Sequence, residues 1–497
     1  MRSDIIVVGG GASGLMAAIG AADALSRTEN GGTVTVLEKM PKVGRKVMLT
    51  GKGRCNLTNV KAWDEWKEHV ATDSQFLSPS FHNFTPENLL ALMKENGLRC
   101  VVEHGDRAFP ESHMAGDVVD TLLRTCTLAG VKVVTGCEVK SVSVTPRGFS
   151  LDCVVTTVKK FETVIEPEKY SCGKLIIATG GLSYPGTGST GDGMKWASET
   201  GHTVTPLFPS LTAIVPKGYK DLGKNPLTED IREAFRGRTA YGKKEDIREA
   251  FRGRTAYGKK VERKPLPLPS HYPSFGKHIE RITPLSPLGE MLCGNNLDNV
   301  AISLFINGDL VKSEFGDLEF TDGGLEGAIG FRVSRKAVIA LENGQKVSVS
   351  IDMKPAVDLE KLDVDVHEKW QQVITDPRSK GQPFQKLFRI MLGKLIPWNI
   401  TGAFLKMNPR VSVDTLASFL KDWRFDIEGF VGFERAVITA GGVSTKEVSA
   451  KTMESRKVPG MYFAGEVLDM DCDTGGYNLQ AAFSTGMLAG QSAAASL

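Results

Sequence analysis

The sequence lacks the patterns that mark a metalloprotein, a disulfide-bonded protein or a membrane protein. Its 8 cysteines include no C-x-x-C pair and its 8 histidines show no metal-ligand spacing, so we expect no metal. Scattered cysteines also favour a reducing compartment, and we expect a cytoplasmic protein. No uninterrupted apolar run reaches the ~18 residues that a membrane span requires, so we expect a soluble protein without a membrane partner.

The sequence also has little excess charge of either sign. Its net charge is +3 over 497 residues, too small to indicate a nucleic-acid partner. Residues 217–264 are an exception, with 15 Lys plus Arg and 8 Asp plus Glu. Within them, residues 229–244 are followed by an identical copy at 245–260. We interpret this stretch as a tandem duplication inside an exposed loop; binding to RNA or another anionic surface is the alternative.

The most informative feature is a glycine turn near the start of the chain. Residues 4–38 follow the order strand, G-x-G-x-x-G turn, helix, strand and acid, which is the context that a dinucleotide-binding motif requires. Gly9 permits the turn, Gly11 lets the backbone approach a pyrophosphate, and Gly14 lets the helix pack on the strand. Glu38 can accept hydrogen bonds from ribose hydroxyls. The pattern predicts dinucleotide binding and suits NAD and FAD equally.

Two further segments favour FAD over NAD. Residues 44–59 combine three glycines and four cations with several amides and hydroxyls, as expected for a loop along a polyanionic ligand. Near the other end, a short strand at 461–464 leaves Glu466 where flavin ribityl hydroxyls can be held. A helix then begins after Gly476, and its N-terminus would stabilise negative charge on a reduced flavin. A site assembled from both ends of the chain fits the extended FAD better.

Five segments in this order resemble the BaiN/YhiN family of FAD-dependent oxidoreductases, which has aminoacetone-oxidase-like relatives. They are GGGASGLMAA, GRKVMLTGKGRCNLTN, DRAFPESHMAGDVVDTL, LIIATGGLSYPGTGSTGDG and the run from AVITAGGVSTKEV to GGYNLQAAFSTG. The resemblance implies an α/β fold, with a glutathione-reductase-type, Rossmann-like FAD domain split by an inserted β-barrel that carries a three-helix bundle. Alternating strands at 205–357 and amphipathic helices at 359–420 agree with this.

We therefore expect five consecutive parts. The FAD domain takes 1–204, the β-barrel with the basic duplicated loop 217–264 takes 205–357, the helical bundle takes 358–420, the return through the barrel takes 421–435, and the second part of the FAD domain takes 436–497. One segment departs from the family: its T-H-x-G-x-S-G-P pattern appears here as residues 321–328 without the His, Ser and Pro.

The resemblance also implies the cofactor contacts, residue by residue. FAD is expected to bind noncovalently to Gly9, Gly11, Ala12, Ser13, Gly14, Glu38, Lys39, Arg45, Lys46, Gly53, Cys55, Asn56, Ala178, Thr179, Gly180, Gly465, Glu466, Gly476, Asn478 and Leu479, with a backbone contact from Val139.

Some residues have two interpretations. The second G-x-G-x-x-G, at 186–191, is either an NAD(P) site or, as we favour, a loop beside the flavin. Cys55 and Cys472 are either a redox pair or, as we favour, packing residues. Tyr184 and Tyr477 are either proton donors or packed aromatics, so no catalytic residue is assigned.

The sequence thus predicts an FAD-dependent oxidoreductase in which the flavin exchanges a hydride with a small organic substrate. Reduction of an activated C=C bond, with NAD(P)H as transient electron donor, is the first hypothesis. Oxidation of a small amine by O₂ is the second, and an RNA-directed flavoprotein is a third from another class. We expect a small-molecule substrate rather than a nucleic acid, and the oligomeric state stays open.

Overall fold

The computed structural model describes residues 1–29, 31–159, 162–222 and 277–497, which divide into two compact units. Unit 1 contains Met1–Phe208 and Ile438–Leu497, and unit 2 contains the described residues from Pro209 to Val437. Both copies of the duplicated segment, and all of the basic loop from residue 223 on, lie outside the described residues. None of the described helices is long and apolar enough to cross a membrane.

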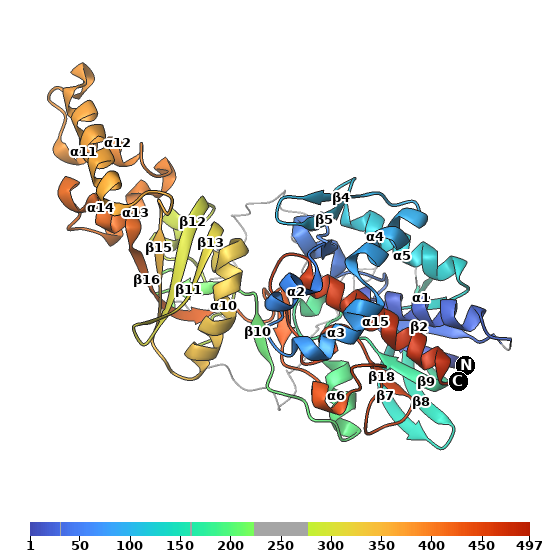
Figure 1. Ribbon diagram of the computed structural model, residues 1–497. Helices are drawn as coiled ribbons and strands as arrows, with labels where there is room; N and C mark the ends of the chain where they lie inside the picture. The colour runs from blue at the N-terminus through green and yellow to red at the C-terminus, as the bar shows by residue number, and fades with distance from the viewer. Residues whose placement is uncertain (30, 160–161, 223–276) are drawn as a thin grey trace. The chain divides into compact units, whose positions relative to one another are not determined.

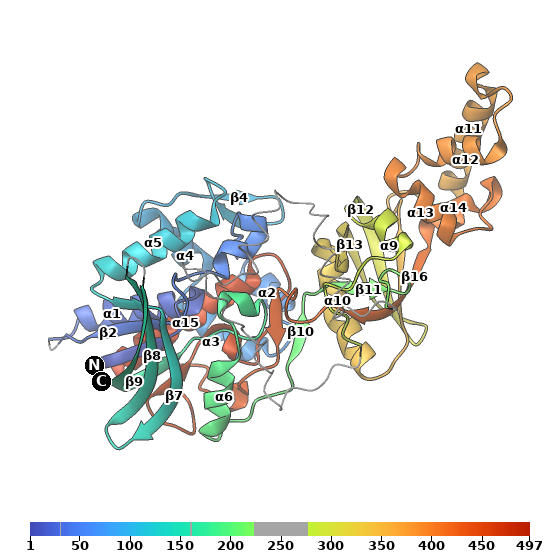
Figure 2. The same cartoon turned by 180° about the vertical axis from the view of Figure 1, so that it is seen from behind.

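Unit 1 is built on a sheet with the strand order β6-β2-β1-β9-β8-β7, and β18 pairs with β9 off this path. The strands β1, β2, β6 and β18 run parallel to their neighbours, whereas β7, β8 and the first part of β9 form an antiparallel meander, seen in Figure 2. The bounds are β1 Arg2–Val8, β2 Val34–Glu38, β6 Lys132–Thr135, β7 Cys137–Thr145, β8 Gly148–Lys159, β9 Glu162–Ile177 and β18 Met461–Phe463.

The two ends of the chain meet through two helices rich in small residues. Helix α1 (Ala12–Ser26) packs against α15 (Tyr477–Ala495), as Figure 1 shows. A Cβ atom on Gly490 would lie 2.0 Å from the backbone oxygen of Ala17, and one on Gly20 would lie 2.8 Å from that of Met487. Since these distances are shorter than any van der Waals contact, the helices reach this separation only with glycine at both positions.

The remaining elements of unit 1 surround this core. A small antiparallel sheet has the order β3-β5-β4. The α4 helix begins with a capping box formed by Thr85 and Asn88, which supplies partners to N–H groups that the first turn leaves open. The other bounds are η1 Val47–Gly53, β3 Thr58–Asn59, α2 Trp63–Trp66, η2 Lys67–His69, α3 Ser74–Asn83, α4 Pro86–Glu95, β4 Cys100–Glu103, β5 Arg107–Pro110, α5 Ala115–Leu128, η3 Pro185–Thr187, α6 Asp192–Glu199, β17 Ile438–Ala440, η6 Thr445–Glu447 and η7 Gly465–Val467. Strand β10 (Phe208–Ser210) contains the last residue of this part of unit 1 and the first two of unit 2.

Unit 2 contains a closed six-stranded barrel with the order β11-β14-β13-β12-β15-β16, which confirms the predicted β-barrel. Aromatic side chains fill part of its core, where Trp423 contacts Phe320, Phe404 and Phe425. Helix α10 packs against strands of the barrel. The bounds are β11 Ile214–Pro216, α9 Pro287–Leu292, β12 Asn296–Ile306, β13 Asp309–Thr321, β14 Gly324–Glu326, α10 Gly327–Glu342, β15 Val347–Asp352 and β16 Trp423–Phe430.

A helical bundle lies between β15 and β16 in the chain, as expected. The described residues form four α-helices here, one more than the resemblance implied. The additional break follows from the sequence: α12 ends at Leu392, with Gly393 as its C-cap, and Pro397 cannot continue a helix from the preceding turn. The bounds are α11 Leu359–Thr375, η4 Pro377–Ser379, α12 Phe384–Leu392, η5 Trp398–Ile400, α13 Thr401–Met407 and α14 Val413–Lys421.

Candidate functional site

The glycine turn in unit 1 leaves its backbone open on one side. Gly9 has φ +106°, and a Cβ there would lie 2.4 Å from the backbone oxygen of Ala178. A Cβ on Gly14 would lie 1.8 Å from the backbone oxygen of Gly9, so this glycine is needed for close packing. Around Gly11, in contrast, a Cβ would meet no described atom within 4 Å, and no side chain caps the α1 helix there. The open N–H groups of the first turn are therefore available to an anionic ligand.

Glu38 is held beside this turn by two backbone N–H groups. The N–H of Gly10 donates to Oε2 and the N–H of Met40 donates to Oε1, both at 2.7 Å. Burial raises the pKa of the Glu38 carboxyl, although these two donors and the nearby Lys39 and Arg45 act in the opposite direction. Further hydroxyl donors would satisfy the carboxylate and lower the cost of keeping it ionised.

The loop after β2 has an unusual backbone. Gly51, Lys52, Gly53 and Cys55 all have φ between +57° and +87°, and these left-handed residues, interrupted by Arg54 at φ −87°, fix the loop's path. A Cβ on Gly53 would meet no described atom within 4 Å, so the backbone is open there as well. Asn56 joins this loop to the C-terminal motif: in the amide orientation that satisfies both neighbours, its side chain donates to the Thr58 backbone oxygen (3.1 Å) and accepts from the Gly476 N–H (3.2 Å).

Lys46 and Glu466 join four segments that are distant in the sequence. Lys46 Nζ lies 2.6 Å from Glu466 Oε2 and donates to Ser183 Oγ at 2.5 Å. Glu466 Oε1 accepts from Ser183 Oγ (2.6 Å) and from the Thr439 N–H (2.8 Å). Glu466 thus has three described partners, which the prediction that it holds flavin ribityl hydroxyls did not foresee. Gly465 lies directly against Ser13 at the start of α1, where a Cβ would be 2.5 Å from Oγ.

The second glycine loop, at 186–191, lies next to the loop that follows Glu38. Lys39 Nζ lies 2.6 Å from Asp192 Oδ2 and also donates to Thr190. A Cβ on Gly188 would lie 2.8 Å from Cγ of Met40. This placement supports the interpretation of the loop as part of the same site rather than as a separate NAD(P) site.

The segment Ala178–Thr179–Gly180 lies at the end of β9, against the glycine turn. Ala178 is buried and its backbone oxygen limits the space at Gly9, while Gly180 has φ +72°. The Thr179 hydroxyl is buried without a hydrogen-bond partner among the described residues. Such a group is costly to bury, which makes this turn a candidate for a ligand or water contact.

The C-terminal motif uses its amide side chain to hold its own loop. Asn478 Oδ1 accepts from the Cys472 N–H (2.9 Å), and Nδ2 donates to the Cys472 backbone oxygen (2.8 Å). Its contact to a cofactor would therefore come from the backbone of the first turn of α15, which also contains Leu479. Val139, the predicted adenine contact, is buried on β7 opposite Cys153.

The two cysteines of the cofactor motifs are buried thiols. Burial raises the pKa of the Cys55 thiol to about 12 and that of the Cys472 thiol well above its ordinary value. A thiol with such a pKa is not a thiolate at neutral pH. The neighbouring thiol that contributes to raising the Cys55 pKa is that of Cys100, not that of Cys472. These observations favour the packing role over the redox pair.

Sequence reasoning missed a cluster beside the start of α15. His69 Nδ1 lies 3.1 Å from Asp473 Oδ2, and the Asp473 N–H donates to the His69 backbone oxygen at 2.8 Å. The imidazole stacks on the Tyr477 ring with centroids 4.2 Å apart. No described residue hydrogen-bonds to Nε2 of His69. Tyr477 was noted as a candidate proton donor, but the pairing of His69 with Asp473 has no signal in the sequence.

In unit 2, the segment that departs from the family pattern carries ion pairs. Arg435 lies 2.9 Å from Asp322, and it donates to both carboxylate oxygens of Glu326, at 2.6 and 3.0 Å. Arg281 lies 3.2 Å from Asp322. Asp322, at the position of the family's histidine, therefore takes part in a structural ion-pair network.

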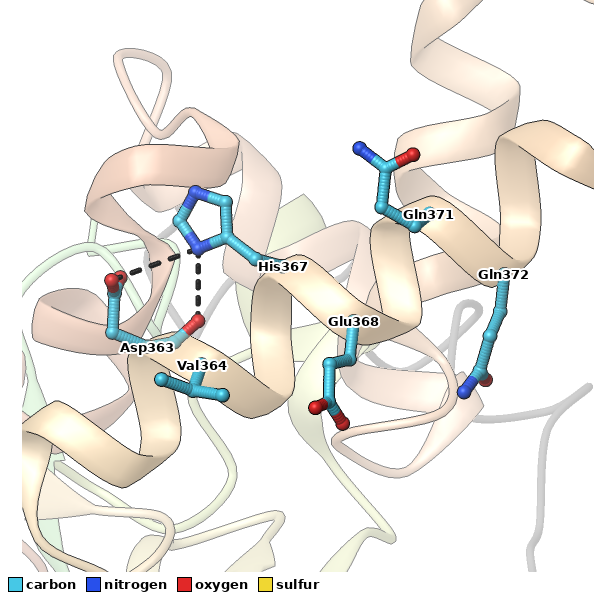
Figure 3. A pocket seen from close by; sticks show the side chains of 6 residues that line it. All are labelled: Asp363, Val364, His367, Glu368, Gln371 and Gln372. Carbon is cyan, nitrogen blue, oxygen red and sulfur yellow. Dashed lines mark hydrogen bonds and ion pairs between the residues drawn. The ribbon is translucent and has the colours of Figure 1, made fainter.

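Unit 2 also has a shallow surface depression of about 660 Å³ on α11, shown in Figure 3. Its lining side chains all come from this one helix and point in different directions, so they do not converge on a common point. None of the predicted cofactor contacts is among them. They are Asp363, Val364, His367, Glu368, Gln371 and Gln372.

Comparison with known proteins identifies the family. The sequence profile described as "HI0933-like protein Rossmann domain" matches residues 3–492. A 3-dehydro-bile acid delta(4,6)-reductase from Clostridium scindens is 26% identical over 98% of both chains. Ribosomal RNA dihydrouridine synthases are similar too: that of Escherichia coli is 28% identical over 97% of this chain and 96% of its own, and that of Haemophilus influenzae is 26% identical over the same shares.

Among solved structures, a mutant of FrdA from the E. coli quinol fumarate reductase matches 100% of this chain and 70% of its own, with 14% identity and a TM-score of 0.44. The 3-ketosteroid delta1-dehydrogenase from Sterolibacterium denitrificans matches 100% of both chains, with 12% identity and a TM-score of 0.44.

Proposed function

Since the chain belongs to the HI0933-like Rossmann family and is an FAD-dependent oxidoreductase, we propose that it reduces a C=C bond conjugated to a carbonyl group. The observation that carries this proposal is that the names of its relatives describe reactions of the same type. A delta(4,6)-reductase of a 3-dehydro bile acid and a dihydrouridine synthase both add two hydrogens to a double bond in a ring that bears a carbonyl group. The whole chain aligns with both, so the same reaction type is the most economical assignment.

The residues of the unit 1 site fit FAD. The open backbone at Gly11 and the uncapped start of α1 suit its pyrophosphate, and Glu38 suits its adenosine ribose. The open backbone at Gly53 and the first turn of α15 suit the rest of the molecule. When bound, FAD supplies the hydride. We propose that the full set of predicted contacts, including Lys39, Arg45, Val139 and Thr179, forms this site.

The residue that the protein itself contributes to the reaction is a proton donor. A conjugated double bond that gains a hydride at one carbon needs a proton at the other. We assign this proton to Nε2 of the His69 imidazolium, the form that carries a proton on both ring nitrogens, because Asp473 Oδ2 lies 3.1 Å from Nδ1, accepts its proton in a hydrogen bond and thereby fixes the ring. Stacking on Tyr477 keeps the imidazole beside the start of α15.

Two classes of substrate contain a double bond that can undergo the reaction that we propose. A small enone is the first candidate, in agreement with the name of the bile-acid relative. A uracil base in ribosomal RNA is the second, because two relatives are named for that product. Oxidation of a small amine by O₂ stays an alternative prediction, and the same experiment distinguishes it from reduction of a double bond.

The experiment measures the absorbance of the flavin under anaerobic conditions. Purified protein, yellow from noncovalent FAD that acid precipitation releases, is mixed anaerobically with NADH or NADPH, and bleaching of the flavin is recorded. We expect bleaching, and then rapid reoxidation on addition of a 4-en-3-one steroid or a uridine-containing RNA. A reduced flavin that O₂ reoxidises at once and neither substrate reoxidises would contradict the proposal, and bleaching by a small amine would favour the oxidase.

A further inference from the structure

The helical bundle of unit 2 contains a long segment with cations and no acids. Residues 377–410, which we call the basic segment, include seven Lys plus Arg and no Asp or Glu. They cover η4, α12, η5 and α13. The neighbouring helix α11 has the opposite character, with four acids and two Lys. The charge of the bundle is therefore separated between its helices, although the whole chain is nearly neutral.

The cations of the basic segment are exposed and mostly unpaired. Arg378 forms an ion pair with Asp376, just outside the segment. Hydrogen bonds from the side chain and backbone of Arg378 lower the pKa of the Asp376 carboxyl to about 2. No described residue forms an ion pair with any of the other six, which are Lys380, Lys386, Arg389, Lys394, Lys406 and Arg410.

An exposed tryptophan is fixed beside one of these cations. The guanidinium of Arg389 lies 4.9 Å from the centroid of the Trp398 ring and donates to the Thr401 hydroxyl at 3.1 Å. A Cβ on Gly393 would lie 2.5 Å from the same ring, so only glycine leaves room for it. Trp398 nevertheless keeps 51% of its surface exposed. A large apolar side chain held rigid and still exposed is suited to contact a ligand.

We propose that the basic segment binds single-stranded nucleic acid, with phosphates on its lysines and an unpaired base on Trp398. Exposed cations without carboxylate partners bind phosphates by releasing counterions, and a fixed aromatic ring beside them stacks a base. An anionic membrane fits less well, because α12 buries four of its apolar side chains in the bundle and leaves Phe384 as its one largely exposed apolar side chain; the buried ones are Leu387, Phe388, Met391 and Leu392. The binding site goes beyond the proposed reaction, and its test needs no turnover.

The test measures binding of a fluorescein-labelled single-stranded RNA of about 20 nucleotides to the full-length protein, by anisotropy at several salt concentrations. The test variant is the double exchange Lys386→Gln with Lys394→Gln. The matched control is Lys336→Gln with Lys346→Gln, which removes the same charge from exposed positions of unit 2 that, like the two test positions, form no ion pair with a described residue. We expect the test variant to bind about tenfold more weakly and to lower the slope of log K against log salt by about 1.4, the value for two lost phosphate contacts on a single strand.

Trp398→Ala probes the stacking separately. It should weaken binding about tenfold and leave the salt slope unchanged, whereas Trp398→Phe should retain most of the affinity. Thermal melting of each variant checks the bundle, and Trp398→Phe keeps the test valid if the alanine variant does not fold. DNA of the same sequence should bind equally, since the phosphates and base faces are shared.

Three results would overturn the proposal: no binding by the parent protein at low salt, equal weakening in the test and control variants, or tighter binding to phosphatidylserine vesicles than to RNA. A protein that binds RNA but does not reduce a double bond would contradict the proposed function alone.

Discussion

Lys46 and Glu466, which are 420 residues apart in the chain, form an ion pair with Nζ and Oε2 2.6 Å apart. The side chains are 23% and 11% exposed, so solvent screens this pair less than one on the surface. Ser183 and Thr439 complete the set of partners. The pair therefore joins the loop after the first βαβ unit to the segment after β18, and both segments carry predicted cofactor contacts.

Glu466→Gln should destabilise unit 1 and weaken FAD binding together. The amide keeps one acceptor but loses the charge that pairs with Lys46, and the cost expected for a hydrogen bond to a charged group is about 1–3 kcal/mol. Denaturant unfolding and flavin release measure the two effects. Glu199→Gln is the control, because Glu199 forms an exposed pair with Lys195 at 3.8 Å and should change stability by less than about 0.5 kcal/mol. Equal losses in both variants would contradict the role of the pair.

FAD affinity should fall as the pH is lowered through the pKa of Glu38. Burial raises this pKa above its ordinary value near 4.5, and ribose hydroxyls would favour the ionised form, so binding should release a proton in that range. The fall should approach about tenfold per pH unit. In the apoprotein the sign is reversed: the folded state binds this proton more tightly, so its stabilising contribution is lost as the pH rises through the Glu38 pKa.

Calorimetry of FAD binding at several pH values checks this prediction. Glu38→Gln is the matched variant and should bind FAD more weakly by about 1–3 kcal/mol, without the pH dependence. If the variant keeps the parent's pH dependence, another group is responsible and the ribose contact is wrongly assigned.

His69→Asn should separate the two halves of the reaction. Asparagine can still donate to Asp473, but it cannot supply a proton at the position of Nε2. Flavin reduction by NAD(P)H should keep its rate, and reoxidation by the enone should slow by about 10²- to 10⁴-fold. Stopped-flow absorbance measures both steps. His104→Asn, a change at an exposed histidine, is the control. Equal slowing of both half-reactions would indicate a structural role for His69.

Deleting residues 245–260, one copy of the duplicated segment, should leave the fold and the FAD content unchanged. Because the copies are identical and hydrophilic, we interpret them as loop sequence, and halving a loop changes its closure free energy by only about 0.6 kcal/mol. Thermal melting and flavin absorbance are compared with the parent. A fall of many degrees would show that the repeat is structural, and lost activity at unchanged stability would place it near the substrate.

The sequence predicts the local parts of this molecule well. The turn at Gly9–Gly14 and the acid at the end of β2 follow from a pattern of fewer than forty residues. The barrel and the helical bundle follow from changes in hydrophobic period, although the break at Pro397 was not foreseen. Contacts between distant segments have no such signal: His69 meets Asp473, and Lys46 meets Glu466, only because β18 joins β9 after the whole of unit 2.

This late pairing has a consequence during protein synthesis. Strand β18 (Met461–Phe463) pairs with Leu175–Ile177 of β9, and all of unit 2 is translated between them. On the ribosome, the nascent chain therefore exposes an apolar strand edge until residues 461–463 emerge. Unpaired edges of this kind invite aggregation, and the predicted cofactor contacts from Gly465 onward join the others only once β18 has paired.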